Sequence, residues 1–144
     1  MHFAPIKIFW IYITAYEWIF RCTLEAIGGV QPKVIFTDSD PAVIAAIQVI
    51  YPQAYHLLCI YHIVENVKRK AKSKLRGNSV TKFVDDFYHM RNSYSQEEFE
   101  LWYQEMLIKY ESCHPYLEKK LYPTRASWAR YFIIKIFTTG VEST

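Results

Sequence analysis

The segment between residues 33 and 75 constrains the fold most, because its apolar pattern changes four times. Short apolar runs at residues 33–37 and 55–59 predict two strands, the first from its β-branched and aromatic side chains. Longer stretches with helical spacing follow at residues 42–50 and 60–75. An order of strand, helix, strand and helix predicts parallel strands joined by a helical crossover. We therefore expect an α/β fold for this part of the chain.

The residues around these elements mark where helices begin and end. Asp40 is suited to accept hydrogen bonds from the N–H groups at a helix start, and Pro41 fits the first helical position. Residues 42–50 are apolar on nearly every face, which predicts a helix buried on several sides. An earlier helix is predicted over residues 11–27, ended by the glycine pair at 28–29.

After Gly77 the pattern is helical throughout. Ser79 is the expected cap of one helix, and Ser95 with Glu98 forms a capping box that begins another. The second helix has one apolar face, which predicts packing in a core: Phe99, Trp102, Tyr103, Met106, Leu107 and Tyr110.

Two further helical pieces complete this half of the chain. Pro115 begins a short one, and residues 126–137 form the last, closed near Gly140. The shift from α/β to all-α patterns predicts two regions. They are a partial α/β core at residues 1–76 and a helical insertion at residues 77–144 that leads back to the core.

Composition excludes several classes of protein. The chain has 144 residues, and 51% are hydrophobic, which excludes disorder over most of its length. Its three cysteines are odd in number and widely spaced, which argues against a disulfide framework and for a reducing compartment. The apolar run at residues 8–15 is interrupted by Glu17 and Arg21, short of the roughly 20 residues that span a membrane. We expect a soluble intracellular protein without a membrane partner.

Asp38 is the first candidate for chemistry. It stands where a predicted parallel strand ends, and open α/β sheets bind ligands at the carboxyl ends of their strands. A carboxylate at that position can hold a divalent metal ion. Asp is also common in turns and caps, and position alone favours that interpretation.

Cys59 and His62 form a C-x-x-H motif at the second change from strand to helix. Thiolate and imidazole are zinc ligands, but a structural zinc site needs four ligands. The sequence has no second C-x-x-C or H-x-x-H pair. Taken alone, Cys59 is more simply interpreted as a small buried apolar residue.

Residues 68–76 contain six basic side chains and no acidic one. A basic helix face binds phosphates through counterion release, whereas most charge runs are only solvated faces. The lack of acidic residues favours an anionic partner, DNA being one. The candidate DNA-binding residues are Lys68, Arg69, Lys70, Lys72, Lys74 and Arg76.

Taken in order, these features resemble the transposase domain of Mutator-like elements (MULE), a family that includes the plant far-red-response transcription factors. The resemblance covers residues 16–76 and returns near the end of the chain. It is carried by Tyr16-Glu17-Trp18, residues 32–38, 42–47, 51–54, 56–62 and 65–67, and then by Trp128, Tyr131, Phe132, residues 137–140, Ser143 and Thr144.

The resemblance implies a ribonuclease-H-like fold and DDE chemistry in the nucleus. Three acidic residues of such enzymes hold two Mg²⁺ or Mn²⁺ ions that promote in-line attack on a DNA phosphodiester. Asp38 matches the second of these acids and is the implied catalytic and metal-binding residue. Cys59 and His62 match the family's C-x-x-H signature, whose role stays open.

The chain departs from the family pattern at both ends. None of the 15 residues before Tyr16 is acidic, so the first acid is not found, and the chain stops before the last Glu is expected. One carboxylate of three does not assemble a two-metal site. We therefore predict a truncated chain that is not a competent transposase, with an exposed sheet edge that favours self-association.

Three hypotheses about function follow from the sequence. The leading one is a transposase-derived, DNA-associated domain with an incomplete catalytic site. The second is a non-enzymatic DNA-binding or regulatory protein that uses the basic residues at 68–76. The third is a structural or interaction domain whose likeness to transposases is only ancestral.

Overall fold

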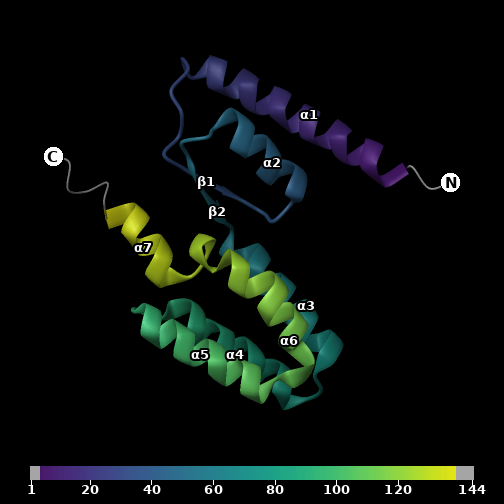
Figure 1. The fold of residues 1–144 in the computed structure, drawn as a ribbon, viewed down its shortest axis with the longest axis vertical. Helices are drawn as coiled ribbons and strands as arrows, with labels where there is room; N and C mark the ends of the chain where they lie inside the picture. Colours follow the sequence, from purple (N-terminus) through teal and green to yellow (C-terminus); the bar gives the residue numbers. More distant parts are fainter. Residues whose placement is uncertain (1–3, 139–144) are drawn as a thin grey trace. The chain divides into compact units, whose positions relative to one another are not determined.

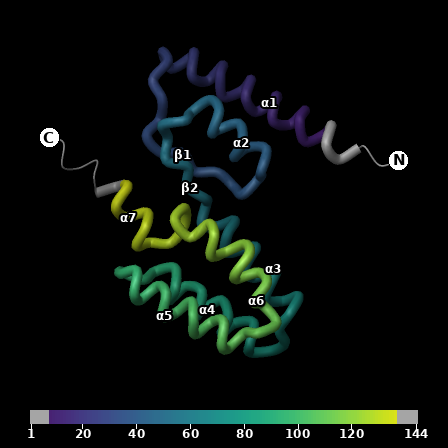
Figure 2. The backbone as a smooth tube through the Cα atoms, viewed as in Figure 1, coloured from purple at the N-terminus to yellow at the C-terminus, as the bar shows by residue number. Residues whose placement is uncertain are grey.

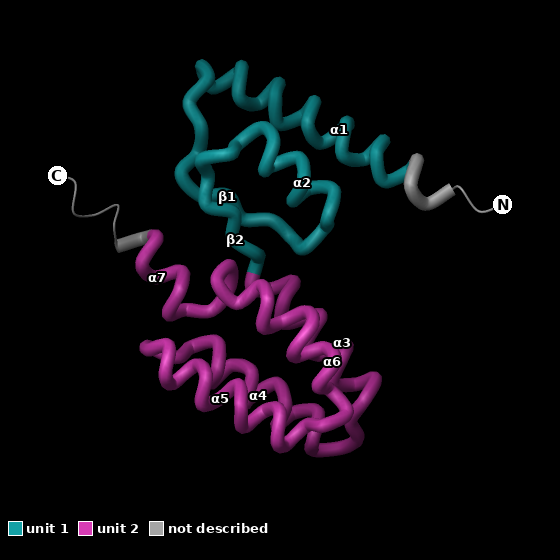
Figure 3. The backbone as a smooth tube through the Cα atoms, in the orientation of Figure 1, with its two compact units in different colours: residues 1–59 teal, residues 60–144 magenta. Residues whose placement is uncertain are grey.

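Two compact units make up the chain, residues 1–59 and residues 60–144 (Figure 3). The structure is a computed structural model, in which the backbone of residues 4–138 and the side chains of residues 8–136 are described. It is mixed α/β and mostly helical, with two parallel strands. The expected division into a partial core at residues 1–76 and a helical insertion at residues 77–144 stays a prediction.

The first unit consists of α1 (Ala4–Ala26), β1 (Val34–Thr37), α2 (Pro41–Ile50) and β2 (Tyr55–Leu58) (Figure 1). The strands pair in parallel, with Val34 opposite Tyr55 and Thr37 opposite Leu58, and α2 is the crossover between them. The predicted order of strand, helix and parallel strand is therefore confirmed.

Local sequence signals explain the ends of these helices. The Asp40 carboxylate accepts hydrogen bonds from the N–H groups of Ala42 at 2.8 Å and Val43 at 3.5 Å, and Pro41 takes the first helical position. Gly28 and Gly29 end α1 with φ angles of 74° and 79°, a left-handed conformation that glycine adopts without strain. The start of α1 was predicted too late, because residues 4–10 are also helical.

The core of the first unit lies between α1 and α2. Its buried residues are Val43, Ile47, Ile50 and Tyr51, and they pack against Tyr16, Phe20 and Leu24 of α1. The Tyr51 hydroxyl also donates a hydrogen bond of 2.9 Å to the carbonyl of Phe20. These contacts hold α2 in place and therefore position the strand ends on either side of it.

All the secondary-structure elements in the described part of the second unit are helical (Figure 2). The backbone trace shows α4 and α5 lying side by side. Its α-helices are α3 (Ile60–Lys74), α4 (Asn78–Asn92), α5 (Gln96–Lys109), α6 (His114–Tyr116) and α7 (Arg130–Thr138). Short 3₁₀ helices lie at Glu111–Cys113 and Tyr122–Ser127, and a π-helical turn lies at Leu117–Leu121.

Two predicted helix starts in this unit are wrong. Ser79 does not cap α4, because the helix already begins at Asn78 after Gly77, whose φ of 54° turns the chain into it. The last helix begins at Arg130 and not at residue 126, because Trp128 leaves helical geometry with a φ of −144°. The expected end near Gly140 lies outside the described residues.

The capping box and the apolar face of α5 are confirmed in most details. The Ser95 hydroxyl accepts from the Glu98 N–H at 3.1 Å, and the Glu98 carboxylate accepts from the Tyr94 N–H at 2.7 Å. Four of the six predicted core residues of this helix are buried, whereas Trp102 and Leu107 are half-buried. Among the described residues, no helix is long and apolar enough to cross a membrane.

An aromatic cluster forms the centre of the second unit. Trp128 is 1% exposed, and its ring centroid lies 5.4 Å from that of Phe87 and 6.0 Å from that of Phe99. The indole N–H donates a hydrogen bond of 3.1 Å to the Thr124 hydroxyl, so the one polar atom of the ring is satisfied. Trp128 thus fixes the chain after α6 against α4 and α5.

We predict different effects on stability for the two neighbouring aspartates. Asp40→Ala removes the cap of α2 and is expected to lower the free energy of unfolding by about 1 kcal/mol. Asp38→Ala is expected to change it by less than about 0.5 kcal/mol, because Asp38 is exposed. Urea denaturation followed by circular dichroism measures both. Equal losses would show that Asp38 is itself a structural residue.

Candidate functional site

Asp38 follows β1 directly and is exposed, as expected for a ligand-binding carboxylate. One of its carboxylate oxygens accepts a hydrogen bond of 3.3 Å from the N–H of Asp40. The two aspartates therefore have different surroundings, since Asp40 caps α2 and Asp38 borders the solvent. The structure places Asp38 at the carboxyl end of a strand, where α/β proteins bind their ligands.

Cys59 lies at the same edge of the strand pair. It follows β2 directly, and its N–H donates a hydrogen bond of 2.7 Å to the carbonyl of Thr37. Parallel strands place their carboxyl ends together, so the residues after β1 and β2 are neighbours. Asp38 and Cys59, which are 21 positions apart in the sequence, are brought together in this way.

Two side-chain contacts of Thr37 lie at this edge. The Thr37 hydroxyl donates a hydrogen bond of 2.8 Å to the carbonyl of Asp38 and lies 2.6 Å from Nε2 of His56. Because a hydroxyl has one proton to donate, the histidine must be the donor in the second contact. Neutral His56 therefore carries its proton on Nε2, and burial lowers the pKa of the imidazole below 6.5.

The sequence analysis did not select His56 as a site residue. The alternation of side chains along the two strands, combined with their register, would have identified His56 as a neighbour of Thr37. Ile35 pairs with His56 in the register, and Thr37 lies two residues beyond Ile35 on the same face of the strand. The contact could be predicted only once the register was known.

The described residues do not complete a metal site around Asp38. Nowhere in the described chain do three or more His, Cys, Asp or Glu side chains gather as metal ligands. Magnesium needs several oxygen ligands in near-octahedral geometry. The residues present therefore do not fit the two-metal arrangement that the family resemblance implies.

The two members of the C-x-x-H motif lie in different units. Cys59 is the last residue of the first unit and is half-buried. His62 is exposed in the first turn of α3, where its ring meets the Tyr61 ring edge-on at 5.5 Å. The role of the motif stays open, as the sequence analysis left it.

The basic residues of α3 do not all share one face. Arg69 and Lys72 are exposed, on the side away from the buried stripe formed by Val67 and Ala71. Lys68 lies nearby but forms an ion pair of 3.0 Å with Glu65, and this hydrogen bond raises the pKa of the lysine. Arg69 and Lys72 therefore present exposed positive charge on this side of the helix.

The other basic candidates have different positions. The ammonium group of Lys70 lies 6.0 Å from the centre of the Tyr116 ring, on the flank of the helix. Lys74 is the last residue of α3, and Arg76 lies beyond it in the connection to α4. Both are exposed. They extend the positive charge toward the end of the helix.

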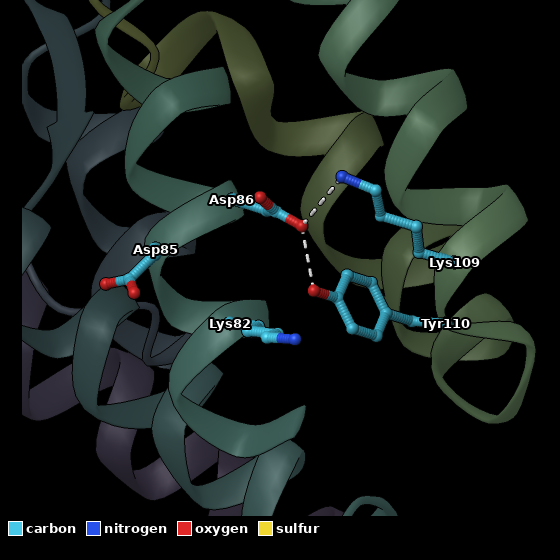
Figure 4. Close-up of a pocket in the computed structure, with 5 residues that line it drawn as sticks. All are labelled: Lys82, Asp85, Asp86, Lys109 and Tyr110. Carbon is cyan, nitrogen blue, oxygen red and sulfur yellow. Dashed lines mark hydrogen bonds and ion pairs between the residues drawn. The ribbon is translucent and has the colours of Figure 1, made fainter. Parts of the chain in front are cut away.

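A polar hollow between α4 and α5 contains charged residues that the sequence analysis missed (Figure 4). The Asp86 carboxylate accepts a hydrogen bond of 2.7 Å from the Tyr110 hydroxyl and pairs with Lys109 at 3.4 Å. Lys82 and Asp85 complete the lining, and the Asp85 side chain points away from this group. Burial, followed by the hydrogen bond to Asp86, raises the pKa of Tyr110. Its phenol is protonated at neutral pH, so the group joins two helices and supplies no nucleophile.

Comparison with known proteins finds a similarity that covers most of the first unit and the first turns of α3. Residues 13–66 match the model of the MULE transposase domain. The resemblance to MULE transposases is confirmed. The MULE match includes Asp38, Cys59 and His62, and it ends before the basic residues of α3 begin.

Relatives from Arabidopsis thaliana extend this similarity over most of the chain. The chain is 28% identical to Protein FAR1-RELATED SEQUENCE 4 over 132 residues, covering 90% of this chain and 18% of the relative. It is 29% identical to Protein FAR1-RELATED SEQUENCE 5, again over 90% of this chain and 16% of the relative. Protein FAR-RED IMPAIRED RESPONSE 1 is 24% identical, over 89% of this chain and 15% of its own length.

The chain therefore spans less than a fifth of the length of these relatives. No solved structure gives a significant match to it. The comparisons thus show similarity to the MULE transposase domain and to FAR1-related proteins, and the fold described above rests on the structure of this chain alone.

We predict that stability depends on pH through His56. The lowered pKa means that the unfolded chain takes up a proton at a higher pH than the folded chain does. The free energy of unfolding should therefore fall as pH decreases below 6.5 and stay unaffected by this group above it. Urea denaturation between pH 7.5 and 5 measures this loss, which His56→Gln should remove. An NMR titration that gave His56 a pKa of 6.5 or higher would contradict this pH dependence.

Proposed function

We propose that this chain is a DNA-associated part of a DDE-type, transposase-derived protein with a ribonuclease-H-like core. Asp38 is its site carboxylate. One observation carries the proposal. Asp38 is exposed at the carboxyl end of a parallel strand, inside the segment that matches the MULE domain. Its neighbour Asp40 serves the helix instead, which leaves Asp38 without a comparable structural role.

The arrangement of the first unit supports the ribonuclease-H-like part of the proposal. A parallel pair with a buried crossover helix is the kind of unit from which such α/β sheets are built. The hydrogen bond from the Cys59 N–H to the Thr37 carbonyl holds the carboxyl ends of the two strands side by side. A ligand bound at this edge would meet Asp38 from the solvent side.

Cleavage of DNA by this chain alone is not part of the proposal. The described residues supply no metal-binding group of three or more ligands, and a two-metal mechanism depends on such a group. Asp38 can hold a cation only weakly without further ligands. The chain is accordingly proposed to contribute one residue to the site and to bind DNA without cutting it.

The accessible charges of α3 are the proposed contact with DNA. Arg69 and Lys72 are exposed on one side of the helix, and neither makes an ion pair within the described part of the chain. Phosphate groups attract such charges and release counterions on binding, without sequence preference. Association with DNA would place the functional protein in the nucleus.

We predict weak cation binding at Asp38 and no nicking of DNA. Mn²⁺ should broaden the NMR signals of residues near Asp38 in the wild-type chain, and Asp38→Asn should remove this effect. Supercoiled plasmid incubated with the chain and Mg²⁺ or Mn²⁺ should stay intact. Nicking that Asp38→Asn abolished would show a complete metal site and contradict the proposed division of roles. An absence of broadening near Asp38 would refute its assignment as a site carboxylate.

We predict that the chain binds duplex DNA in a salt-dependent manner. The double variant Arg69→Ala/Lys72→Ala should weaken binding about tenfold and flatten the plot of log affinity against log salt by about 2. Fluorescence anisotropy with labelled DNA at several salt concentrations measures both quantities.

The matched control removes two exposed lysines elsewhere in the same unit. Lys119→Ala/Lys120→Ala changes the net charge by the same amount, and both side chains are exposed. It should leave the slope close to that of the wild type. Equal effects of the two double variants would indicate attraction by net charge alone and would contradict a contact at α3.

A further inference from the structure

Two arginines of the second unit come together where α4 ends and α7 begins. Trp128 contacts Phe87 of α4, with ring centroids 5.4 Å apart, and so holds the start of α7 against this helix (Figure 1). Arg91 lies about one turn beyond Phe87 on α4, and Arg130 follows Trp128 closely as the first residue of α7. Arg91 and Arg130, here called the arginine pair, are both half-buried and border the solvent.

Neutral neighbours orient both members of the arginine pair. The guanidinium carbon of Arg130 lies 4.3 Å from the centre of the Tyr94 ring, which is a cation–π contact. Tyr94 follows the end of α4, so its ring stands beside Arg91 in the chain. The Nη1 group of Arg91 donates a hydrogen bond of 2.7 Å to the amide oxygen of Asn92. These contacts fix the two planar groups and leave their charges uncompensated.

The arginine pair has no carboxylate partner within the described residues, whose ion pairs include neither Arg91 nor Arg130. In that part of the chain, the buried Nε of Arg91 also lacks a hydrogen-bond partner. Arg125 has a buried Nε as well, but the Glu100 carboxylate lies 4.0 Å from it. Burying an arginine is costly unless its charge is compensated, so the arginine pair requires an explanation that Arg125 does not.

Two electrostatic interactions at the arginine pair are unfavourable. Burial lowers the pKa of the Arg91 guanidinium group, and the positive charge of Arg130 lowers this pKa further. Arg130 is also the first residue of α7, where the positive end of the helix dipole disfavours a cation. An anion bound between the two guanidinium groups would relieve both interactions.

A phosphate group fits the arginine pair better than a carboxylate does. Each guanidinium group donates two parallel N–H bonds, so two such groups can bind several oxygens of one tetrahedral anion. A carboxylate has only two oxygens and one charge, which a single guanidinium group already satisfies. Phosphate carries more than one charge at neutral pH when it is free or a monoester, which matches the two cations.

We propose that Arg91 and Arg130 bind a phosphate group at the junction of α4 and α7, and that Tyr94 holds Arg130 in place for it. The inference rests on the second unit alone and is independent of the contact with DNA proposed for Arg69 and Lys72. The chemistry recognised is that of the phosphate oxygens, which either inorganic phosphate or the backbone of DNA supplies.

Titration of the full chain with inorganic phosphate tests the site. The Nε–H NMR signals of Arg91 and Arg130 should shift and reach saturation, whereas sodium chloride at the same ionic strength should not produce these shifts. Arg130→Gln should raise the dissociation constant for phosphate about tenfold, because one of the two guanidinium groups is lost. Arg76→Gln is the matched control, because it removes an exposed arginine elsewhere in the same unit and should leave the constant unchanged.

A conservative variant separates the shape of the guanidinium group from its charge. The double variant Arg91→Lys/Arg130→Lys keeps both charges but removes the two planar groups. Phosphate should raise the melting temperature of the wild-type chain above its value in chloride of equal ionic strength, because a ligand stabilises the state that binds it. The double variant should lose this rise, and circular dichroism checks that it remains helical.

Binding of labelled DNA, measured by fluorescence anisotropy, identifies the source of the phosphate. Weaker binding of DNA by Arg130→Gln than by Arg76→Gln assigns the site to the DNA backbone. Equal binding by the two variants, with saturable binding of inorganic phosphate by the wild type, assigns the site to a small phosphate. The phosphate titration contains no DNA, so its outcome does not depend on the function proposed for α3.

Two results would overturn the proposal. One is the absence of saturable shifts at Arg91 and Arg130 at millimolar phosphate. The other is an equal loss of phosphate affinity in Arg130→Gln and Arg76→Gln, since this would show attraction by net charge without a defined site.

Discussion

The parallel pairing of β1 and β2 is the interaction on which the candidate site depends. At one end of the pair the Tyr55 N–H donates a hydrogen bond of 2.9 Å to the Lys33 carbonyl. At the other end the Cys59 N–H donates one of 2.7 Å to the Thr37 carbonyl. Parallel pairing requires a crossover, which α2 provides, and it brings the ends of both strands to one edge. Without this register, Asp38, Cys59 and the pair of Thr37 and His56 would be unrelated positions in the sequence.

The second unit is held together in another way. Its helices gather around aromatic rings, with Trp128 buried beside Phe87 and Phe99. Polar contacts such as that of Tyr110 with Asp86 add orientation between α4 and α5. The interior of this unit is filled by large rings, and α3 exposes Arg69 and Lys72 at its surface.

Several features could be predicted from the sequence because their causes are local. The cap at Asp40 and Pro41 and the capping box at Ser95 each depend on a few consecutive residues, and the structure confirms both. The start of α4 was missed because Gly77, not a side-chain cap, turns the chain there. The contact of His56 with Thr37 was missed because it depends on register, which no short segment reveals.

The sequence by itself determined the order of the elements, the resemblance to the MULE domain and the position of Asp38 after a strand. These properties follow from apolar spacing and motif order, which are carried along the chain. Only the tertiary structure decided that Asp38 is exposed while Asp40 is used by a helix, and that the basic residues of α3 divide between two sides.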